Sequence, residues 1–311
     1  MSGHQELFTL GEGDDAASIV KGMLLHNLHS KLLAAGCKTL SLLICKNIQN
    51  QAEILKFGGI ECVVRAMEEY EKDRQLQLHA CGTLVDLACN NTDTKERIAA
   101  AGGLERIIAA MATFAGDSEV QLQACRALCN MAHNADANRV KVAALGGIDR
   151  IIDAMRNYKA YQQLQLFALK TLVNLADSCA DNKVKIAGAG GIECIIEAME
   201  NHTEVTDVDL QLQACGALRN LICKTQKRDT RDEIVTKGGA EQIVRAMTRH
   251  KCHKQLQTTA IGTLSNLAHK HEACQVKLVN AGTHHLKVCP QPHPHLSASK
   301  RQRADLSHVC V

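Results

Sequence analysis

The fold of this chain is decided by the stretch GGLERIIAAM (residues 102–111), which is followed by VQLQACRALCNMA (120–132) and NRVKVAAL (138–145). A new Gly-Gly pair begins at position 146, 44 residues after the first pair. Further pairs begin at 58, 190 and 238, and a degenerate Ala-Gly pair begins at 281. The intervals along the chain are 44, 44, 44, 48 and 43 residues, so the sequence is a tandem repeat.

Three other features keep the same step. A glutamine after Leu or Val recurs as Gln77, Gln121, Gln165, Gln211 and Gln257. A methionine after alanine recurs as Met67, Met111, Met155, Met199 and Met247. An acid follows each Gly-Gly pair by two residues, as Glu61, Glu105, Asp149, Glu193 and Glu241. Several independent features that hold one period indicate repeated structural units rather than chance similarity.

Each unit is expected to form three helices. Apolar residues at helical spacing, such as Leu104, Ile107, Ile108 and Met111, follow the glycines. Glycine suits the turn before them because positive φ strains a residue that carries a Cβ. The acid then lies in the first helical turn, where the helix dipole favours it. The repeats contain no proline, as unbroken helices require.

One unit of 44 residues cannot bury the apolar faces of three short helices, so neighbouring units must stack on one another. We therefore predict an all-α solenoid over 14–281, with units 14–57, 58–101, 102–145, 146–189, 190–237 and 238–281. The first unit lacks its Gly-Gly pair and is expected to cap the solenoid. Residues 1–13 and the Pro- and His-containing residues 282–311 are expected to be disordered.

The period and the three-helix order resemble the armadillo repeat over Asp14 to about Ala281. The residue pattern of the units is most similar to the armadillo region of Roco-type leucine-rich-repeat kinases and to armadillo-only proteins of unicellular eukaryotes. The resemblance implies a right-handed superhelix of about six three-helix units. No kinase, GTPase or leucine-rich-repeat segment is present in the sequence.

A polar stripe marks the second helix of each unit. At 100° per residue, Gln123, Arg126 and Asn130 lie on one side of an otherwise apolar cylinder. The last position of the stripe recurs as Asp86, Asn130, Asn174, Asn220 and Asn266. Asparagine is a poor residue inside a helix, so four at one step require an explanation. The predicted partner-binding residues are Asp86, Arg126, Asn130, Lys170, Asn174, Gly216, Asn220, Gly262 and Asn266.

Two explanations of the asparagines stay open at this point. A carboxamide has donors and an acceptor, so a row of amides matches the N–H and C=O groups of an extended peptide. The resemblance implies the same role, because armadillo proteins carry an asparagine ladder in their concave groove. Alternatively, the amides hydrogen-bond within the solenoid and tie one unit to the next.

The residue four positions before each ladder residue sets the expected ligand. Nuclear-import adaptors of this fold have tryptophan there, whereas this chain has Gly82, Arg126, Lys170, Gly216 and Gly262. Basic import signals are therefore not the expected ligand. Arg126 and Lys170, with Arg219 nearby, favour an acidic partner segment. The glycines cost about 1 kcal/mol each relative to alanine inside a helix, which indicates close approach of a neighbour or a ligand.

Composition excludes several classes of function. A net charge of +3 is too small for nucleic acid or a membrane surface to be the main partner. Cys37, Cys81, Cys125 and Cys215 share one position of successive units, which is typical of core residues and not of a disulfide framework. Without a signal peptide or an apolar run of spanning length, the chain is expected in the cytoplasm or the nucleus.

No catalytic motif is recognisable, so the chain is not expected to be an enzyme or to hold a cofactor. His and Cys gather late in the chain, for example His269, His271 and Cys274, but without a second well-spaced pair no metal site is expected. The predicted function is a scaffold that binds an extended partner segment in its groove, with self-association through the C-terminal end as a further interaction. The alternative is a regulatory or assembly segment related to Roco-type kinases.

Overall fold

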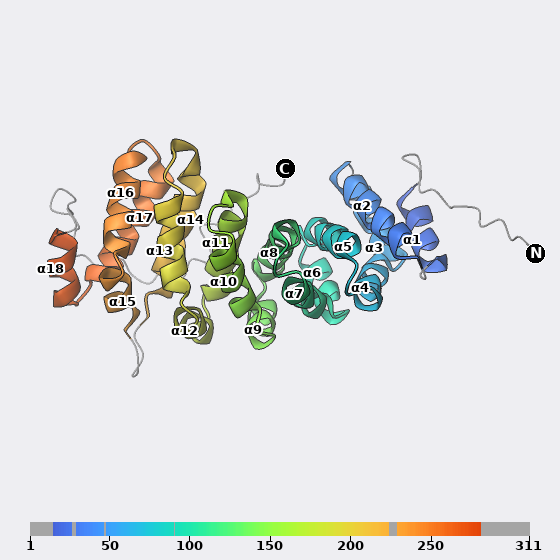
Figure 1. Cartoon of the computed structure of the whole chain (residues 1–311), viewed down its shortest axis with the longest axis horizontal. Coiled ribbons are helices and arrows are strands. Elements are labelled where there is room, and N and C mark those ends of the chain that lie inside the picture. The colour runs from blue at the N-terminus through green and yellow to red at the C-terminus, as the bar shows by residue number, and fades with distance from the viewer. Residues whose placement is uncertain (1–14, 27–28, 47, 90, 224–228, 281–311) are drawn as a thin grey trace, which may run out of the picture.

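The computed structural model describes residues 15–26, 29–46, 48–89, 91–223 and 229–280. Within these ranges the chain forms α-helices and one short 3-10 helix, and no strand. The predicted segments 1–13 and 282–311 lie outside the described residues. Figure 1 shows the helices following one another along the long axis of the molecule, from α1 at one end to α18 at the other. The predicted all-α solenoid is confirmed.

The helices recur in sets of three and form three rows. The first row contains α1 (Ala16–Leu25), α4 (Gly59–Glu69), α7 (Gly103–Thr113), α10 (Gly147–Asn157), α13 (Gly191–Asn201) and α16 (Gly239–Arg249). The second row contains α2 (Ser30–Lys46), α5 (Arg74–Leu87), α8 (Ser118–Ala132), α11 (Gln162–Ala176), α14 (Val208–Leu221) and α17 (Lys254–Ala268). The third row contains α3 (Ile48–Lys56), α6 (Thr92–Ala100), α9 (Asp136–Ala144), α12 (Ala180–Gly188), α15 (Thr230–Thr236) and α18 (Glu272–Asn280). The 3-10 helix η1 (Val205–Asp207) precedes α14.

One continuous core runs through the solenoid, from Ala16 in α1 to Leu278 in α18. Each second-row helix packs on the next one, α2 on α5, α5 on α8, and so on to α17. Cys37, Cys81, Cys125 and Cys215 are free thiols that are completely buried in this row. Burial raises the pKa of Cys81, Cys125 and Cys215 to about 12, so these thiols stay neutral. The prediction that they are small core residues is confirmed.

The two glycines of each pair have different tasks. The first, such as Gly146, adopts a left-handed conformation with φ of +77°, as the turn prediction required. The second, such as Gly147, lies against the preceding third-row helix. A Cβ added to Gly147 would lie 2.6 Å from Val142 Cγ1 and 2.9 Å from the Val142 carbonyl oxygen. The same closeness recurs at Gly59, Gly103, Gly191 and Gly239, so the second glycine allows the helices to touch.

The recurring glutamine completes the end of each first-row helix that follows a Gly-Gly pair. Nε2 of Gln121 donates to the carbonyl oxygens of Met111 (2.8 Å) and Phe114 (2.9 Å). The last carbonyls of a helix have no partner within the helix, and these ends are buried. Gln77, Gln165, Gln211 and Gln257 make the equivalent pairs of bonds. This need for a buried donor explains why glutamine recurs at the unit period.

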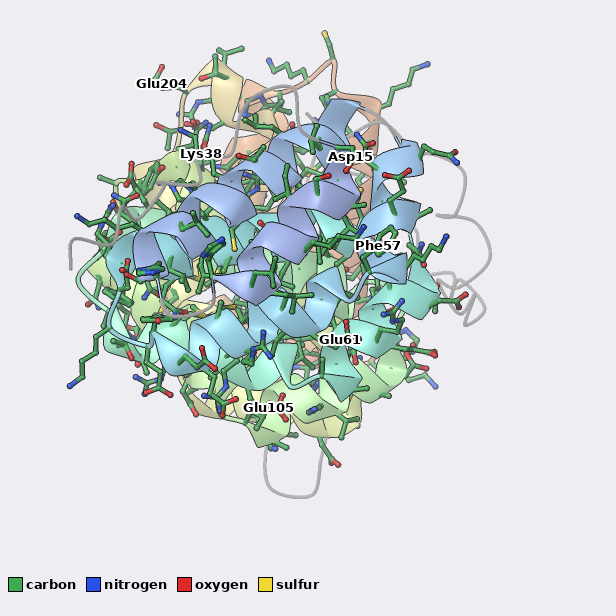
Figure 2. All side chains as sticks on the ribbon, turned by 90° about the vertical axis from the view of Figure 1, so that its right-hand side faces the viewer. Asp15, Lys38, Phe57, Glu61, Glu105 and Glu204 are labelled. Carbon is green, nitrogen blue, oxygen red and sulfur yellow. The ribbon has the colours of Figure 1, made fainter. Side chains whose placement is uncertain are left out.

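Three of the five recurring acids tie the first row to the third row or to the residue after it. Glu61 pairs with Arg97 at 3.1 Å, Glu105 pairs with Lys141 at 2.8 Å, and Glu193 pairs with Lys237 at 3.4 Å. Figure 2 shows Glu61 and Glu105 on the same edge of the molecule, as successive units require. The pairs are partly exposed, so each contributes about 1 kcal/mol or less.

Candidate functional site

Eight of the nine predicted partner-binding residues are partly or fully exposed on one surface, which we call the ladder face, whereas the ninth, Gly216, is buried. It is the accessible surface of α5, α8, α11, α14 and α17 around Asp86, Asn130, Asn174, Asn220 and Asn266. The first four of these side chains are half-buried, and Asn266 is exposed. Because successive second-row helices pack on one another, the five polar side chains follow each other from unit to unit.

Three of the asparagines complete the end of the preceding second-row helix. Nδ2 of Asn130 donates to the Val85 carbonyl oxygen at 2.9 Å, and Nδ2 of Asn174 donates to that of Cys129 at 3.0 Å. Nδ2 of Asn220 donates to the Val173 carbonyl oxygen at 3.2 Å. These carbonyls belong to the last turns of α5, α8 and α11, where helical hydrogen bonding runs out. The Cys129 carbonyl also accepts the His133 backbone N–H at 3.2 Å, so Asn174 adds a second donor there. The tie between units is therefore present, and each tie uses one N–H of the amide.

Asp86 occupies the ladder position but has no N–H to donate. The Ser41 hydroxyl of α2 donates to its carboxylate instead, so the link to the preceding unit is kept with the donor and acceptor exchanged. Burial raises the pKa of Asp86, and the Ser41 bond and the charge of Arg126 partly oppose this effect. Sequence reasoning did not find Ser41, although it lies one residue before the ladder position of the first unit.

Asparagines that tie two units together should contribute more to stability than Asn266, which makes no such tie among the described residues. We expect Asn130→Ala to lower the free energy of unfolding by about 1 kcal/mol, because the Val85 carbonyl loses its donor. Asn266 makes no hydrogen bond with its side chain among the described residues, so Asn266→Ala is the matched control and should leave stability unchanged. Urea denaturation followed by circular dichroism measures both, and equal losses would contradict the capping role.

A cluster of two cations and one ring lies in the middle of the ladder face. The guanidinium carbon of Arg126 on α8 lies 5.3 Å from the centroid of the Phe167 ring on α11. Nζ of Lys170, one turn after Phe167, lies 5.1 Å from the same centroid. Phe167 occupies the position on α11 that Gln123 occupies on α8, but nothing in the sequence pattern predicted that both cations would meet at its ring.

Part of the glycine hypothesis is wrong. A Cβ added to Gly262 would have no neighbour within 4 Å, and one added to Gly82 or Gly216 would meet a single side-chain atom at 3.9 or 3.8 Å. No neighbouring helix approaches closely enough to require glycine at these three positions. The remaining explanation from the sequence, approach of a ligand, applies to Gly82 and Gly262, which are half-buried, but not to Gly216, which is buried.

Threonines form a second set of ties that sequence reasoning missed. The hydroxyl of Thr83 donates to the Cys37 carbonyl oxygen at 2.7 Å, and Thr171 and Thr263 donate to those of Cys125 and Cys215 at 3.1 Å. The equivalent residues of the intervening units are Ala127 and Ala217. The sequence signal that could have predicted these ties is a threonine in alternate units. It directly follows Gly82, Lys170 and Gly262.

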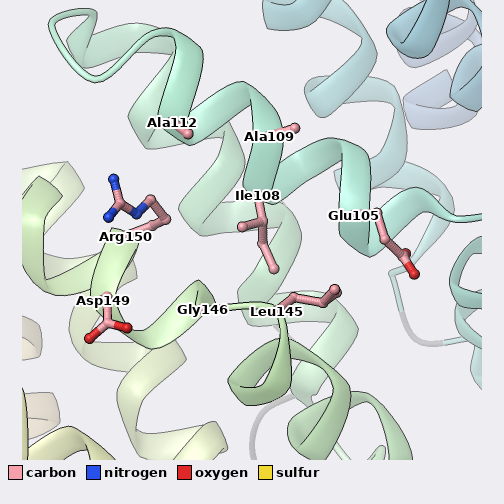
Figure 3. A pocket seen from close by; sticks show the side chains of 8 residues that line it. All are labelled: Glu105, Ile108, Ala109, Ala112, Leu145, Gly146, Asp149 and Arg150. Carbon is pink, nitrogen blue, oxygen red and sulfur yellow. The ribbon is translucent and has the colours of Figure 1, made fainter.

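The best-formed pocket lies away from the ladder face. It has a volume of about 390 Å³ and lies between α7 and α10. Figure 3 shows Glu105 and Ile108 contributed by α7, and Asp149 and Arg150 contributed by α10. It shares no residue with the predicted partner-binding set and has no part in the ladder.

In the structure Asp232 lies beside His271 and Cys274, a neighbour that the sequence did not predict. One ligand atom from each of Asp232, His271 and Cys274 lies within 4.8 Å of the others, a grouping that could hold a metal ion. His271 already has other partners, however. Its Nδ1 accepts the Cys274 backbone N–H at 3.3 Å, and its Nε2 lies 3.4 Å from the Asp232 carboxylate. Nδ1 of His253 accepts the Leu256 backbone N–H at 3.1 Å, and Nε2 of His250 is buried with no hydrogen-bond partner among the described residues. The further late residues Cys289, His293 and His295 fall outside the described residues.

Comparison with known families identifies the repeat. The family model described as the LRRK2 ARM repeat matches residues 102–285, more than half of the chain. The chain belongs to this armadillo-repeat family. Among curated proteins, none matches it. Within the described ranges of this armadillo-repeat chain, no helix is long and apolar enough to cross a membrane.

Solved structures show the same fold. An engineered protein of a structural genomics consortium is 25% identical, with a TM-score of 0.72, and the match covers 86% of this chain and 61% of that one. A designed armadillo-repeat protein in complex with the peptide (KR)4 is 14% identical, with a TM-score of 0.66 over 82% of this chain and all of that one. A structure from work on the interaction between cadherin and β-catenin is 17% identical, with a TM-score of 0.56, covering 87% and 56% of the two chains.

Proposed function

We propose that this armadillo-repeat chain is a non-catalytic scaffold that binds an extended segment of a partner protein along the ladder face. The amides of Asn130, Asn174, Asn220 and Asn266 would pair with the partner's main chain. The observation that carries the proposal is the row of these side chains, one to each successive second-row helix, on a face that stays accessible to solvent.

The hydrogen bonds that tie neighbouring units together are compatible with capture of a peptide by the same amides. A carboxamide has two N–H donors and an oxygen with two lone pairs, and a tie uses only one donor. Among the described residues, no hydrogen bond engages Oδ1 of Asn130 or Asn220. The tie also holds each amide in one orientation, which lowers the entropic cost of binding a ligand.

The spacing of the ladder fits an extended chain. Packed helices are about 8–10 Å apart, and an extended peptide rises about 3.3 Å per residue. One unit of the solenoid therefore corresponds to two or three peptide residues. Main-chain pairing of this kind gives affinity, and side chains of the partner between the rungs give specificity.

The open glycines add support from the shape of the ladder face. Gly82 and Gly262 keep a helical surface free of side chains, although alanine would fit and would stabilise the helix. Two solved structures of the same fold also support a peptide or protein partner. One is the designed armadillo-repeat protein in complex with (KR)4, and the other comes from work on the interaction between cadherin and β-catenin.

A steric block of the ladder face tests the proposal. Peptides are first selected from a random twelve-residue display library against the unmodified chain. We expect Gly82→Gln/Gly262→Gln to weaken binding of the selected peptides at least about tenfold, because the new side chains occupy the path of the ligand. Fluorescence anisotropy measures the affinities, and thermal melting should show an unchanged or higher Tm.

Gly116→Gln is the matched control, since a Cβ there, like one at Gly262, meets no atom within 4 Å, but the residue lies in the loop between α7 and α8. It should bind the selected peptides like the unmodified chain. Equal binding by the control and the ladder-face double variant would rule out capture along this face.

The match to the LRRK2 ARM repeat supports a second candidate, a regulatory or assembly segment that acts within or beside a Roco-type kinase. Its test is purification of the native protein with its partners. A stable complex with a Roco-type kinase would favour this candidate, and selective capture of unrelated extended segments would favour the scaffold.

A further inference from the structure

Arg126 and Lys170, the two cations in the middle of the ladder face, lack acidic partners, whereas several other half-buried cations, such as Arg106, Lys141 and Arg231, have one. Most long basic side chains that have a partner in the solenoid meet a carboxylate: Arg74, Arg97, Arg106, Lys141, Lys159 and Arg231 all lie within 3.2 Å of one. Arg126 and Lys170 are half-buried, and neither forms an ion pair within the described ranges.

Arg126 is held in place but is incompletely satisfied. Its Nη1 donates to Gln123 Oε1 at 3.3 Å, a bond to a neutral group within the same helix. Its Nε is buried and has no hydrogen-bond partner in the described part of the chain. The nearby Asp86 carboxylate is engaged by Ser41 and lies beyond ion-pair distance of Arg126. A guanidinium that loses water without gaining an acceptor costs free energy until an acceptor arrives.

Lys170 completes the arrangement from the next helix. Apart from its contact with the Phe167 ring, it has no hydrogen bond or ion pair among the described residues. Arg126 and Lys170 therefore approach one ring from two neighbouring helices, and their like charges repel each other. An anion placed between them would relieve this repulsion and supply the missing acceptor at the same time.

We propose that Arg126, Phe167 and Lys170 form an anion-binding subsite of the ladder face, which takes a carboxylate or phosphate side chain of the bound segment. The inference rests on the proposed function, because the segment must lie along the ladder to present its side chain there. Aspartate, glutamate and phosphoserine share the required chemistry, a group of oxygen acceptors that carries negative charge. The partner is thus an acidic segment, and the contacts with the Phe167 ring position the two cations that would bind it.

The test compares labelled ten-residue peptides that differ only at alternate positions: (Glu-Ala)5, (Gln-Ala)5 and (phosphoserine-Ala)5, with (Lys-Arg)4 as a cationic probe. Alternate residues of an extended chain point to the same side, so each peptide presents one chemistry to the ladder face. We expect an acidic peptide to bind at least about tenfold more tightly than (Gln-Ala)5, and (Lys-Arg)4 not to bind. The preference between the glutamate and phosphoserine peptides identifies the anion.

The variant Arg126→Gln/Lys170→Gln should lose the preference for the acidic peptide and keep its thermal stability. Lys72→Gln/Lys185→Gln removes the same charge from exposed positions away from the ladder face and should keep the preference. No preference in the unmodified chain, no saturable binding of either acidic peptide up to about 1 mM, or a preference that persists in Arg126→Gln/Lys170→Gln would overturn the subsite.

Failure of the subsite is distinguishable from failure of the scaffold. If the peptides selected from the random library are blocked by Gly82→Gln/Gly262→Gln but acidic peptides gain nothing over neutral ones, the subsite falls and the ladder-face function remains. If the glycine variant leaves all peptide binding unchanged while the acidic preference depends on Arg126 and Lys170, the subsite stands apart from the ladder and the proposed binding mode falls.

Discussion

Gly147→Ala is expected to lower the free energy of unfolding by about 2–3 kcal/mol, although alanine is the better helix former. The new Cβ would lie 2.6 Å from Val142 Cγ1, 2.9 Å from the Val142 carbonyl oxygen and 3.1 Å from Ile108 Cδ1. Backbone and a β-branched side chain cannot move aside cheaply, so α9 and α10 must separate. Urea denaturation followed by circular dichroism measures the loss.

The same substitution should have the opposite sign at a helical glycine with open surroundings. Gly262→Ala is expected to raise the free energy of unfolding by about 1 kcal/mol, because the added methyl group meets no atom within 4 Å. We assign close packing to Gly147 and not to Gly262. A loss of stability in Gly262→Ala, or no change of stability in Gly147→Ala, would contradict this assignment.

Gln165→Leu is expected to lower the free energy of unfolding by about 2–3 kcal/mol. The side chain is 1% exposed, and its Nε2 donates to the carbonyl oxygens of Met155 at 2.8 Å and Tyr158 at 3.0 Å. Leucine has a similar size but leaves the end of α10 without its donor in a buried place. Denaturation under the conditions used for the glycine variants measures the change.

Gln163→Leu is the control for this substitution. Gln163 lies two residues earlier on α11, is exposed and makes no hydrogen bond among the described residues. It should change stability by less than about 0.5 kcal/mol. If both glutamines could be replaced at equal cost, packing of the aliphatic stem rather than completion of the α10 end would explain the recurrence of glutamine.

Much of the site could be located from the sequence. Asn130, Asn174 and Asn220 were assigned to one face because a helix of 3.6 residues per turn and a constant unit length place equivalent side chains in a row. Both explanations offered for them required hydrogen bonding at the unit step, and the structure shows the tie directly. Periodicity could not decide between the tie and a ligand, since the two use different atoms of one amide.

Other features depend on contacts that no local pattern encodes. Ser41 donates to Asp86 because α2 and α5 pack side by side, although Ser41 belongs to no repeated motif. Of the two explanations offered for Gly82, Gly216 and Gly262, approach of a neighbour or of a ligand, the first was wrong for a related reason. A glycine inside a helix has the same sequence signature whether it faces a neighbour or open space, and only the packing separates the two cases.

The three-helix unit, the stacking of units and the burial of Cys81 and its equivalents could be predicted from the amino-acid pattern alone, because each of these follows from a periodic apolar pattern that must be covered by the next copy. Which polar atoms meet is known only from the packed helices: Asn130 with the carbonyl of Val85, and Arg126 with Lys170 at the ring of Phe167. These contacts join side chains from different helices, so they depend on how the helices are turned and spaced, which composition and period leave undefined.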